Sequence, residues 1–238
     1  MESLLENLKI ATPLLNYTHQ KIVSLIQNKG WKQLNDTERI RAVYNFVRDE
    51  IAFGYNISDR IKASKVLKDG YGQCNTKGIL LMALLRATGI PCRIHGFMVD
   101  KEMQKGAIKG FFYQQAPKEI LHSWVEIFYK EKWLNLEGFI LDVPYLTQLQ
   151  NKFKDYKCPF YAYAAATPDL QNPPIEWNEN DTYIQKDAIT QDLGIFDTPD
   201  ELFLKHKQNT KPFKTFMFRN FVRHSMNRNV RRMRKKGK

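Results

Sequence analysis

The sequence has no long uninterrupted apolar run and contains few cysteines. No stretch approaches the roughly 18 apolar residues that a membrane-spanning helix requires. The first residues include Glu2 and Glu6 and lack a basic start followed by an apolar block, which excludes a typical secretory signal. Three cysteines, Cys74, Cys92 and Cys158, are too few for a disulfide framework. We therefore expect a cytoplasmic protein with reduced thiols.

Acidic residues are missing from the C-terminal tail. Residues 205–238 contain 13 Lys and Arg and no Asp or Glu, whereas the whole chain of 238 residues has a net charge of +12. The rest of the chain, with 24 basic and 25 acidic residues, is almost neutral. Any anionic partner is therefore expected to bind the tail.

The tail also has a helical pattern of apolar residues. Phe218, Val222, Met226, Val230 and Met233 recur at spacings of three or four, with arginines between them. This pattern fits a helix packed on the body, a nucleic-acid contact or an anionic membrane contact. Between the last two, the abundance of arginine and the absence of tryptophan favour nucleic acid.

The body of the chain predicts an α+β fold. Hydrophobic residues make up 43% of the sequence and aromatic residues 13%, which is enough for a packed core. We expect residues 1–160 to form the main domain and 161–238 an irregular arm followed by the basic helix. Helices are expected at 3–16, 39–51, 61–69, 74–88 and 143–154, and strands at 92–99, 110–115, 119–129 and 132–141.

Cys74 is the first candidate for chemistry. It follows a glycine-containing turn and opens a helix that is apolar all round. The partial positive charge and free N–H groups of a helix N-terminus favour a thiolate and could hold an oxyanion. A lone cysteine is more often a small buried residue, and we interpret Cys92 and Cys158 in that way.

A cysteine nucleophile needs a base and a group that orients the base. His122 lies on the predicted strand 119–129, and a two-residue turn at 130–131 places it diagonally across from Glu137 on the same face. Asp142 has the opposite parity, although a bulge would reverse that, and Glu126 shares the face two positions further along. Register therefore favours Glu137.

Several ordered motifs together resemble the transglutaminase-like superfamily. These are YGQC at 71–74, LLRATGIPCR at 84–93, HSWVE at 122–126, WLNLE at 133–137 and the helix RIRAVYNFVRDEI at 39–51. The resemblance covers about residues 37–142. It implies a papain-like core, in which the cysteine helix packs on an antiparallel sheet, and acyl transfer through a thioester.

The resemblance also implies roles for particular residues. Cys74 would be the nucleophile, His122 the base and Glu137 the orienting group, where the family usually has Asp. Gln73, Asn75 and Trp124 are candidate substrate or oxyanion contacts, although animal transglutaminases have Trp where this chain has Asn75. No acidic loop has calcium-ligand spacing, and we expect no metal or cofactor.

Two functions remain open at this stage. The first is thiol-dependent acyl transfer or amide hydrolysis on a peptide or protein substrate. The second is a catalytically silent scaffold of the same fold that binds nucleic acid through residues 205–238.

Overall fold

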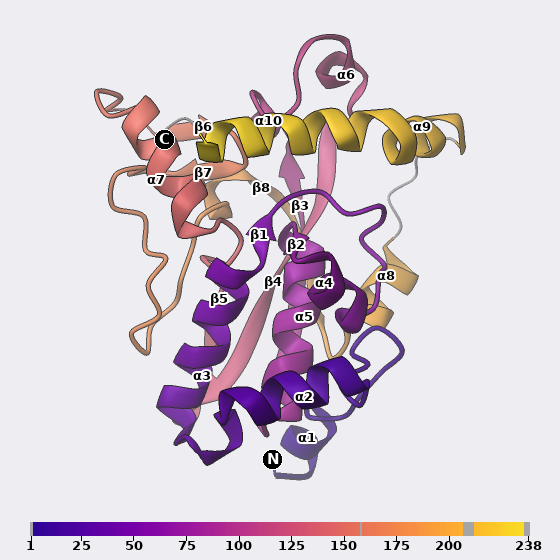
Figure 1. Cartoon of the computed structure of the whole chain (residues 1–238), viewed down its shortest axis with the longest axis vertical. Helices are drawn as coiled ribbons and strands as arrows, with labels where there is room; N and C mark the ends of the chain where they lie inside the picture. The colour runs from indigo at the N-terminus through magenta and orange to yellow at the C-terminus, as the bar shows by residue number, and fades with distance from the viewer. Residues whose placement is uncertain (1, 158, 207–211, 236–238) are drawn as a thin grey trace.

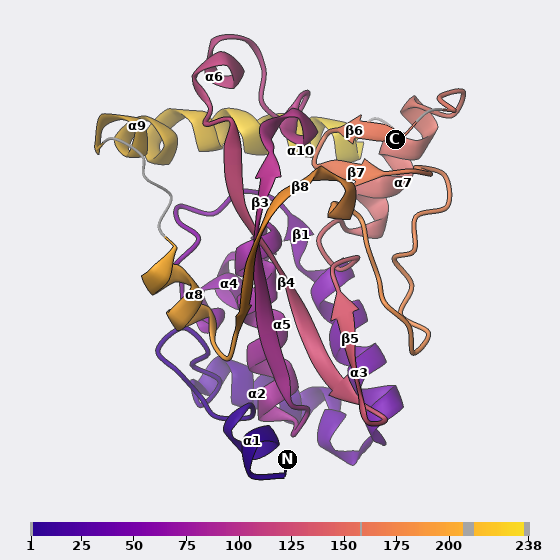
Figure 2. The same ribbon diagram turned by 180° about the vertical axis from the view of Figure 1, so that it is seen from behind.

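The computed structural model describes residues 2–157, 159–206 and 212–235 and has the predicted α+β architecture. Its centre is a twisted antiparallel sheet of four strands in the order β5-β4-β3-β8. Helix α5 and the N-terminal helices lie against one face of this sheet (Figure 1, Figure 2). The four strands are β3 (Cys92–Asp100), β4 (Glu119–Tyr129), β5 (Lys132–Leu136) and β8 (Ile189–Phe196).

Short elements complete the body. Strands β1 and β2 pair in parallel, and β6 and β7 form a small hairpin. The N-terminal elements are α1 (Glu2–Asn7), α2 (Gln20–Lys29), η1 (Trp31–Gln33), α3 (Asp36–Asn45), η2 (Phe46–Glu50), β1 (Ala52–Phe53), α4 (Ala63–Asp69) and β2 (Tyr71–Gly72). The later ones are η3 (Lys101–Gln104), α6 (Gly110–Gln115), α7 (Val143–Lys152), β6 (Phe160–Ala162), β7 (Ala165–Thr167) and η4 (Lys186–Ala188).

Helix α5 (Cys74–Ala87) is the buried axis of the fold. Every residue from Cys74 to Arg86 is buried, as expected for a run that is apolar on all sides. Its one buried lysine, Lys77, donates from Nζ to the backbone oxygens of Arg48 and Ile140 at 3.1 and 3.0 Å. Burial lowers the pKa of Lys77 to about 7. Pairing with backbone carbonyls keeps this polar group satisfied inside the core.

The hairpin between β4 and β5 has the predicted register. Tyr129 pairs with Lys132, and the two turn residues Lys130 and Glu131 have φ of 48° and 62°. Positive φ at both central positions is the hairpin turn that matches strand twist. Strand β5 ends at Leu136, earlier than expected, because the chain turns into the segment that precedes α7.

Besides α2 (Gln20–Lys29), where no helix was expected, three segments differ from the sequence-based expectation. Residues 110–115 form the short helix α6 rather than a strand, and the N-terminal helix spans only Glu2–Asn7. Residues 189–196, expected to be irregular, form β8 at the edge of the sheet. An edge strand pairs through its backbone and needs no apolar alternation, so its polar sequence gave little signal.

The described part of the basic tail, residues 205–206 and 212–235, is mostly helical and packs on the body. The last described elements are α8 (Pro199–Lys205), α9 (Pro212–Met217), η5 (Phe218–Val222) and α10 (Arg223–Lys235). The segment from α9 to α10 crosses one end of the molecule, drawn in yellow at the top of Figure 1. Met226, Val230 and Met233 of α10 are buried against the body. In the described part of the chain, no helix is both long and apolar enough to cross a membrane.

Candidate active site

Cys74 is the first residue of α5, and the turn before it is tightly built. The backbone N–H of Gln73 donates to Thr76 Oγ1 at 3.1 Å, and Gln73 Nε2 donates to Asp59 at 2.7 Å. A Cβ on Gly72 would lie 2.7 Å from Thr76 Oγ1, so only glycine allows this close approach. The Cys74 side chain therefore sits at the positive end of the helix dipole.

His122 lies in the middle of β4, paired with Phe97 of β3, and is fully buried. Its Nε2 is 2.7 Å from Oε1 of Glu137, which is also fully buried. The structure thus brings together the two residues that strand register had paired. The bond leaves Nδ1 as the ring nitrogen available to a second partner.

Glu137 is held from both sides. Its second oxygen, Oε2, accepts backbone N–H groups from Ile184 at 2.8 Å and Gln185 at 2.9 Å. Its own backbone N–H donates to the carbonyl of Thr182 at 3.0 Å. The carboxylate thus accepts three charge-assisted bonds, from His122, Ile184 and Gln185. These bonds fix the carboxylate and hence the orientation of the His122 ring. Sequence reasoning missed this support, because backbone N–H groups carry no residue-type signature.

Cys74 and His122 interact electrostatically. Burial by itself lowers the pKa of His122, but the interactions with Cys74 and with Glu137 outweigh burial and raise that pKa to about 10. Both residues line the cavity described below, and Nδ1 of His122 has no hydrogen-bond partner in the described part of the chain. Loose contacts of this kind are common in substrate-free enzymes. The environment favours an imidazolium beside the sulfur.

Residues 24–138 match the family model described as the Transglutaminase-like superfamily. The matched segment, just under half of the chain, is similar to the transglutaminase-like superfamily. A solved structure from Cytophaga hutchinsonii, provisionally described as a cysteine protease, is similar over 60% of this chain, with 14% identity and a TM-score of 0.43. This chain spans 44% of that protein, less than half of its length. No curated protein matches the sequence significantly.

The transglutaminase-like match contains Cys74, His122 and Glu137 but ends at residue 138. The amides of Ile184 and Gln185 that hold Glu137 lie well beyond it. The later part of the chain thus contributes directly to the site of the transglutaminase-like core.

The other three candidates play different structural parts. The side chain of Asn75 is buried, donates to the Leu121 carbonyl at 3.0 Å and accepts from Ser123 at 2.8 Å. It therefore fastens α5 to β4, and only its backbone N–H remains for an oxyanion. Gln73 lines the cavity described below. Trp124 packs on Phe97, with ring centroids 4.1 Å apart, and does not line that cavity.

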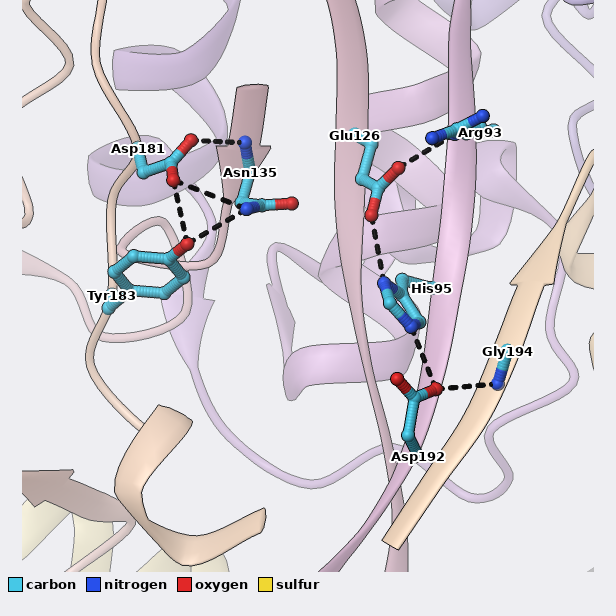
Figure 3. A network of polar contacts seen from close by, with 8 residues as sticks. All are labelled: Arg93, His95, Glu126, Asn135, Asp181, Tyr183, Asp192 and Gly194. Atoms are coloured by element: carbon cyan, nitrogen blue, oxygen red, sulfur yellow. Dashed lines mark hydrogen bonds and ion pairs between the residues drawn. The ribbon is translucent and has the colours of Figure 1, made fainter. Parts of the chain in front are cut away.

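The alternative carboxylates lie elsewhere. Glu126 binds Arg93 at 2.7 Å and His95 at 2.8 Å, in the network of Figure 3. Asp142 caps α7 and pairs with Arg234 of the tail at 2.6 Å. Neither carboxylate contacts the ring of His122.

A cavity of about 530 Å³ opens over Cys74 and His122. Its walls come from four separate parts of the chain, which are residues 53–60, 103–121, 164–206 and the tail from Thr215 to Met226. This volume is in the range of sites that hold small molecules or several peptide residues. Among the described residues, no group of three or more His, Cys, Asp or Glu is arranged to hold a metal ion.

Proposed function

We propose that this protein is a thiol-dependent enzyme that transfers or hydrolyses an acyl group of a peptide-like substrate. The observation that carries the proposal is the fixed Glu137, whose contact with Nε2 leaves Nδ1 of His122 available in the cavity that Cys74 also lines. The match of residues 24–138 to the transglutaminase-like superfamily supports it. A free catalytic thiol also suits a reducing compartment such as the cytoplasm.

The reaction has two halves. The Cys74 sulfur attacks the substrate carbonyl and forms a C–S bond, while backbone N–H groups at the start of α5 stabilise the oxyanion. His122 gives its proton to the leaving amine as the C–N bond breaks, which yields a thioester. It then takes a proton from water or from an acceptor amine, whose attack breaks the C–S bond and frees Cys74.

The test separates hydrolysis from transfer. Tryptic casein peptides are incubated with the protein, with and without hydroxylamine, and the products are identified by mass spectrometry. A new carboxylate indicates hydrolysis, and a hydroxamate indicates a thioester that amines can intercept. Cys74→Ala is expected to abolish both products, whereas Cys92→Ala retains them because Cys92 is buried away from the cavity. Product formation by Cys74→Ala would overturn the proposal.

A second proposed activity concerns the outer side of α10. A hollow of about 620 Å³ is lined there by six cationic or imidazole side chains with Tyr71 and Asn227, and by no acidic residue. Within the described ranges, Arg228, Arg231 and Arg232 form no ion pair. We propose that this surface binds nucleic-acid phosphates. A protein that binds RNA while Cys74 is unreactive would be the silent scaffold.

A further inference from the structure

The cavity above Cys74 has predominantly apolar walls. One wall comes from the segment around α6 and includes Ile108, Phe112 and Ile120. The facing wall comes from the tail and includes Met217, Phe218 and Val222. A substrate group that enters between these walls loses water from apolar surface on both sides, so an apolar group gains most from binding.

The reacting atoms lie at the closed end of this cavity. Cys74 is 8% exposed and His122 is fully buried. Arg60 and Arg219 line the same cavity but are exposed, which places them at its solvent side. An acyl group attached to Cys74 therefore extends between the apolar walls toward two guanidinium groups.

Among the described residues, both guanidinium groups lack a carboxylate partner. In the described part of the chain, neither Arg60 nor Arg219 forms an ion pair. Asp59 also lines the cavity, but its carboxylate accepts a hydrogen bond from Gln73, and burial raises its pKa. Two unpaired arginines at the mouth favour an anionic group, since guanidinium binds carboxylate and phosphate with charge-assisted bonds.

We propose that the acyl donor of this enzyme carries a long apolar segment next to the reacting carbonyl and an anionic group at its far end. The apolar segment lies between α6 and the tail, and the anion binds Arg60 and Arg219. The proposal rests on the proposed function, because it takes Cys74 as the reacting thiol. The tail is then a part of the substrate site and not only a basic appendage.

Chloromethyl ketones test this directly, because their carbonyl takes the place of the substrate carbonyl. The thiolate displaces chloride, a C–S bond forms and the C–Cl bond breaks. Three probes differ only beyond the carbonyl: chloroacetone, 1-chlorodecan-2-one and 10-chloro-9-oxodecanoic acid. The labelling efficiency of Cys74 is measured by mass spectrometry on the full-length protein. We expect the labelling efficiency to rise at least tenfold from chloroacetone to 1-chlorodecan-2-one, because octyl replaces methyl. It should rise about threefold or more again with 10-chloro-9-oxodecanoic acid, because of its carboxylate.

Matched variants separate the two parts of the proposal. Phe218→Ala and Val222→Ala should reduce the increase in Cys74 labelling that the octyl group of the probe gives. Phe216→Ala should not, because Phe216 is 57% exposed and does not line the cavity. Arg219→Gln should reduce the additional labelling that the carboxylate gives and leave the effect of the octyl group unchanged, with Arg228→Gln as its control. Thermal unfolding checks that each variant is folded.

The outcomes distinguish this inference from the proposed function. If chloroacetone labels Cys74 faster than Cys92 but the longer probes gain nothing, the substrate class is wrong and the thiol function stands. If no probe labels Cys74 in preference to Cys92, the proposed function itself is wrong. If the carboxylate of the probe still increases Cys74 labelling in the double variant Arg60→Gln and Arg219→Gln, the assignment of the anionic end is wrong.

Discussion

At the scale of single residues, the orientation of His122 depends on the carboxylate of Glu137, both oxygens of which accept hydrogen bonds. Glu137 is longer than the Asp usual in the family, and its second oxygen is occupied by two backbone amides. The ring of His122 is held by Oε1 while Oε2 stays anchored.

Replacement of Glu137 by Gln is expected to slow alkylation of Cys74 by iodoacetamide at least tenfold at neutral pH. The carboxylate contributes to the raised pKa of His122, so its loss lowers the fraction of imidazolium beside the sulfur. The rate is measured against pH by mass spectrometry. Glu126→Gln is the control, because that carboxylate binds Arg93 and His95 instead. Equal slowing in both variants would show a general loss of structure.

Cysteine labelling tests the site at the same scale. Cys92 is fully buried, and burial raises its pKa, whereas Cys74 lines the cavity. Limiting iodoacetamide at pH 7 should therefore modify Cys74 at least tenfold faster than Cys92. Cys158 lies outside the described residues, and the peptide that contains it is followed in the same digest. Protection of Cys74 alone would contradict the enzyme interpretation.

At the scale of elements, β8 is attached to the sheet by a charged network. His95 of β3 contacts Glu126 of β4 and Asp192 of β8, each at 2.8 Å (Figure 3). Arg93 binds the same Glu126 from the next position on that face. Burial acts to lower the pKa of His95, but the two carboxylates outweigh burial and raise it.

The raised pKa predicts how stability depends on pH. A histidine whose pKa is higher in the folded state stabilises fully below its unfolded pKa of about 6.5, and this contribution is lost as pH rises through the folded value. His95→Gln should therefore lower the thermal midpoint more at pH 6 than at pH 9. Scanning calorimetry at both pH values measures the difference. An equal effect at the two pH values would mean that His95 acts only through packing.

Helix α10 is attached to the body by the side chain of Asn227, which hydrogen-bonds both backbone groups of Tyr55. Asn227 accepts from the N–H of Tyr55 at 2.7 Å and donates to the carbonyl of Tyr55 at 3.0 Å. Asn227→Ala should cost about 1–3 kcal/mol in urea unfolding, because both backbone groups lose their partner in a buried place. Asn229→Ala, which removes only one bond to Ala107, should cost less. A loss below about 0.5 kcal/mol for Asn227→Ala would mean that water replaces the side chain.

At the scale of the whole molecule, charge is concentrated at one end. The tail helix carries its free arginines across the end of the molecule opposite α2 (Figure 1). Because Met226, Val230 and Met233 of this helix are buried, truncation would damage the body. Charge substitution is therefore the cleaner test of an anionic partner.

Replacement of Arg228, Arg231 and Arg232 by Gln should weaken binding to single-stranded RNA and reduce its salt dependence. The slope of log K against log salt should fall by about 0.7 for each phosphate that the variant no longer neutralises. Filter binding at low and moderate salt measures this.

The control changes the same number of charges at the far end, with Lys21, Lys29 and Lys32 replaced by Gln. Cys74 labelling should be unchanged in both triple variants, because none of these side chains lines the cavity over Cys74. Unchanged RNA binding in the arginine variant would leave α10 as a wall of the cavity and an anchor alone.

The sequence by itself predicted the candidate site residues of this protein and determined much of its local structure. A run apolar on all sides predicted the buried helix that begins at Cys74, and strand alternation with a two-residue turn predicted that His122 meets Glu137. These features depend on side-chain type and short spacing, which a sequence displays directly.

Tertiary structure alone decided what surrounds that chemistry. The amides of Ile184 and Gln185 reach Glu137 from almost fifty residues away, and any residue type except proline could supply them. The tail pattern fitted either packing or an external contact, and burial of Met226 and Val230 shows that it packs. Backbone hydrogen bonds and burial between distant segments depend on where the chain is placed in space, and local sequence does not encode that placement.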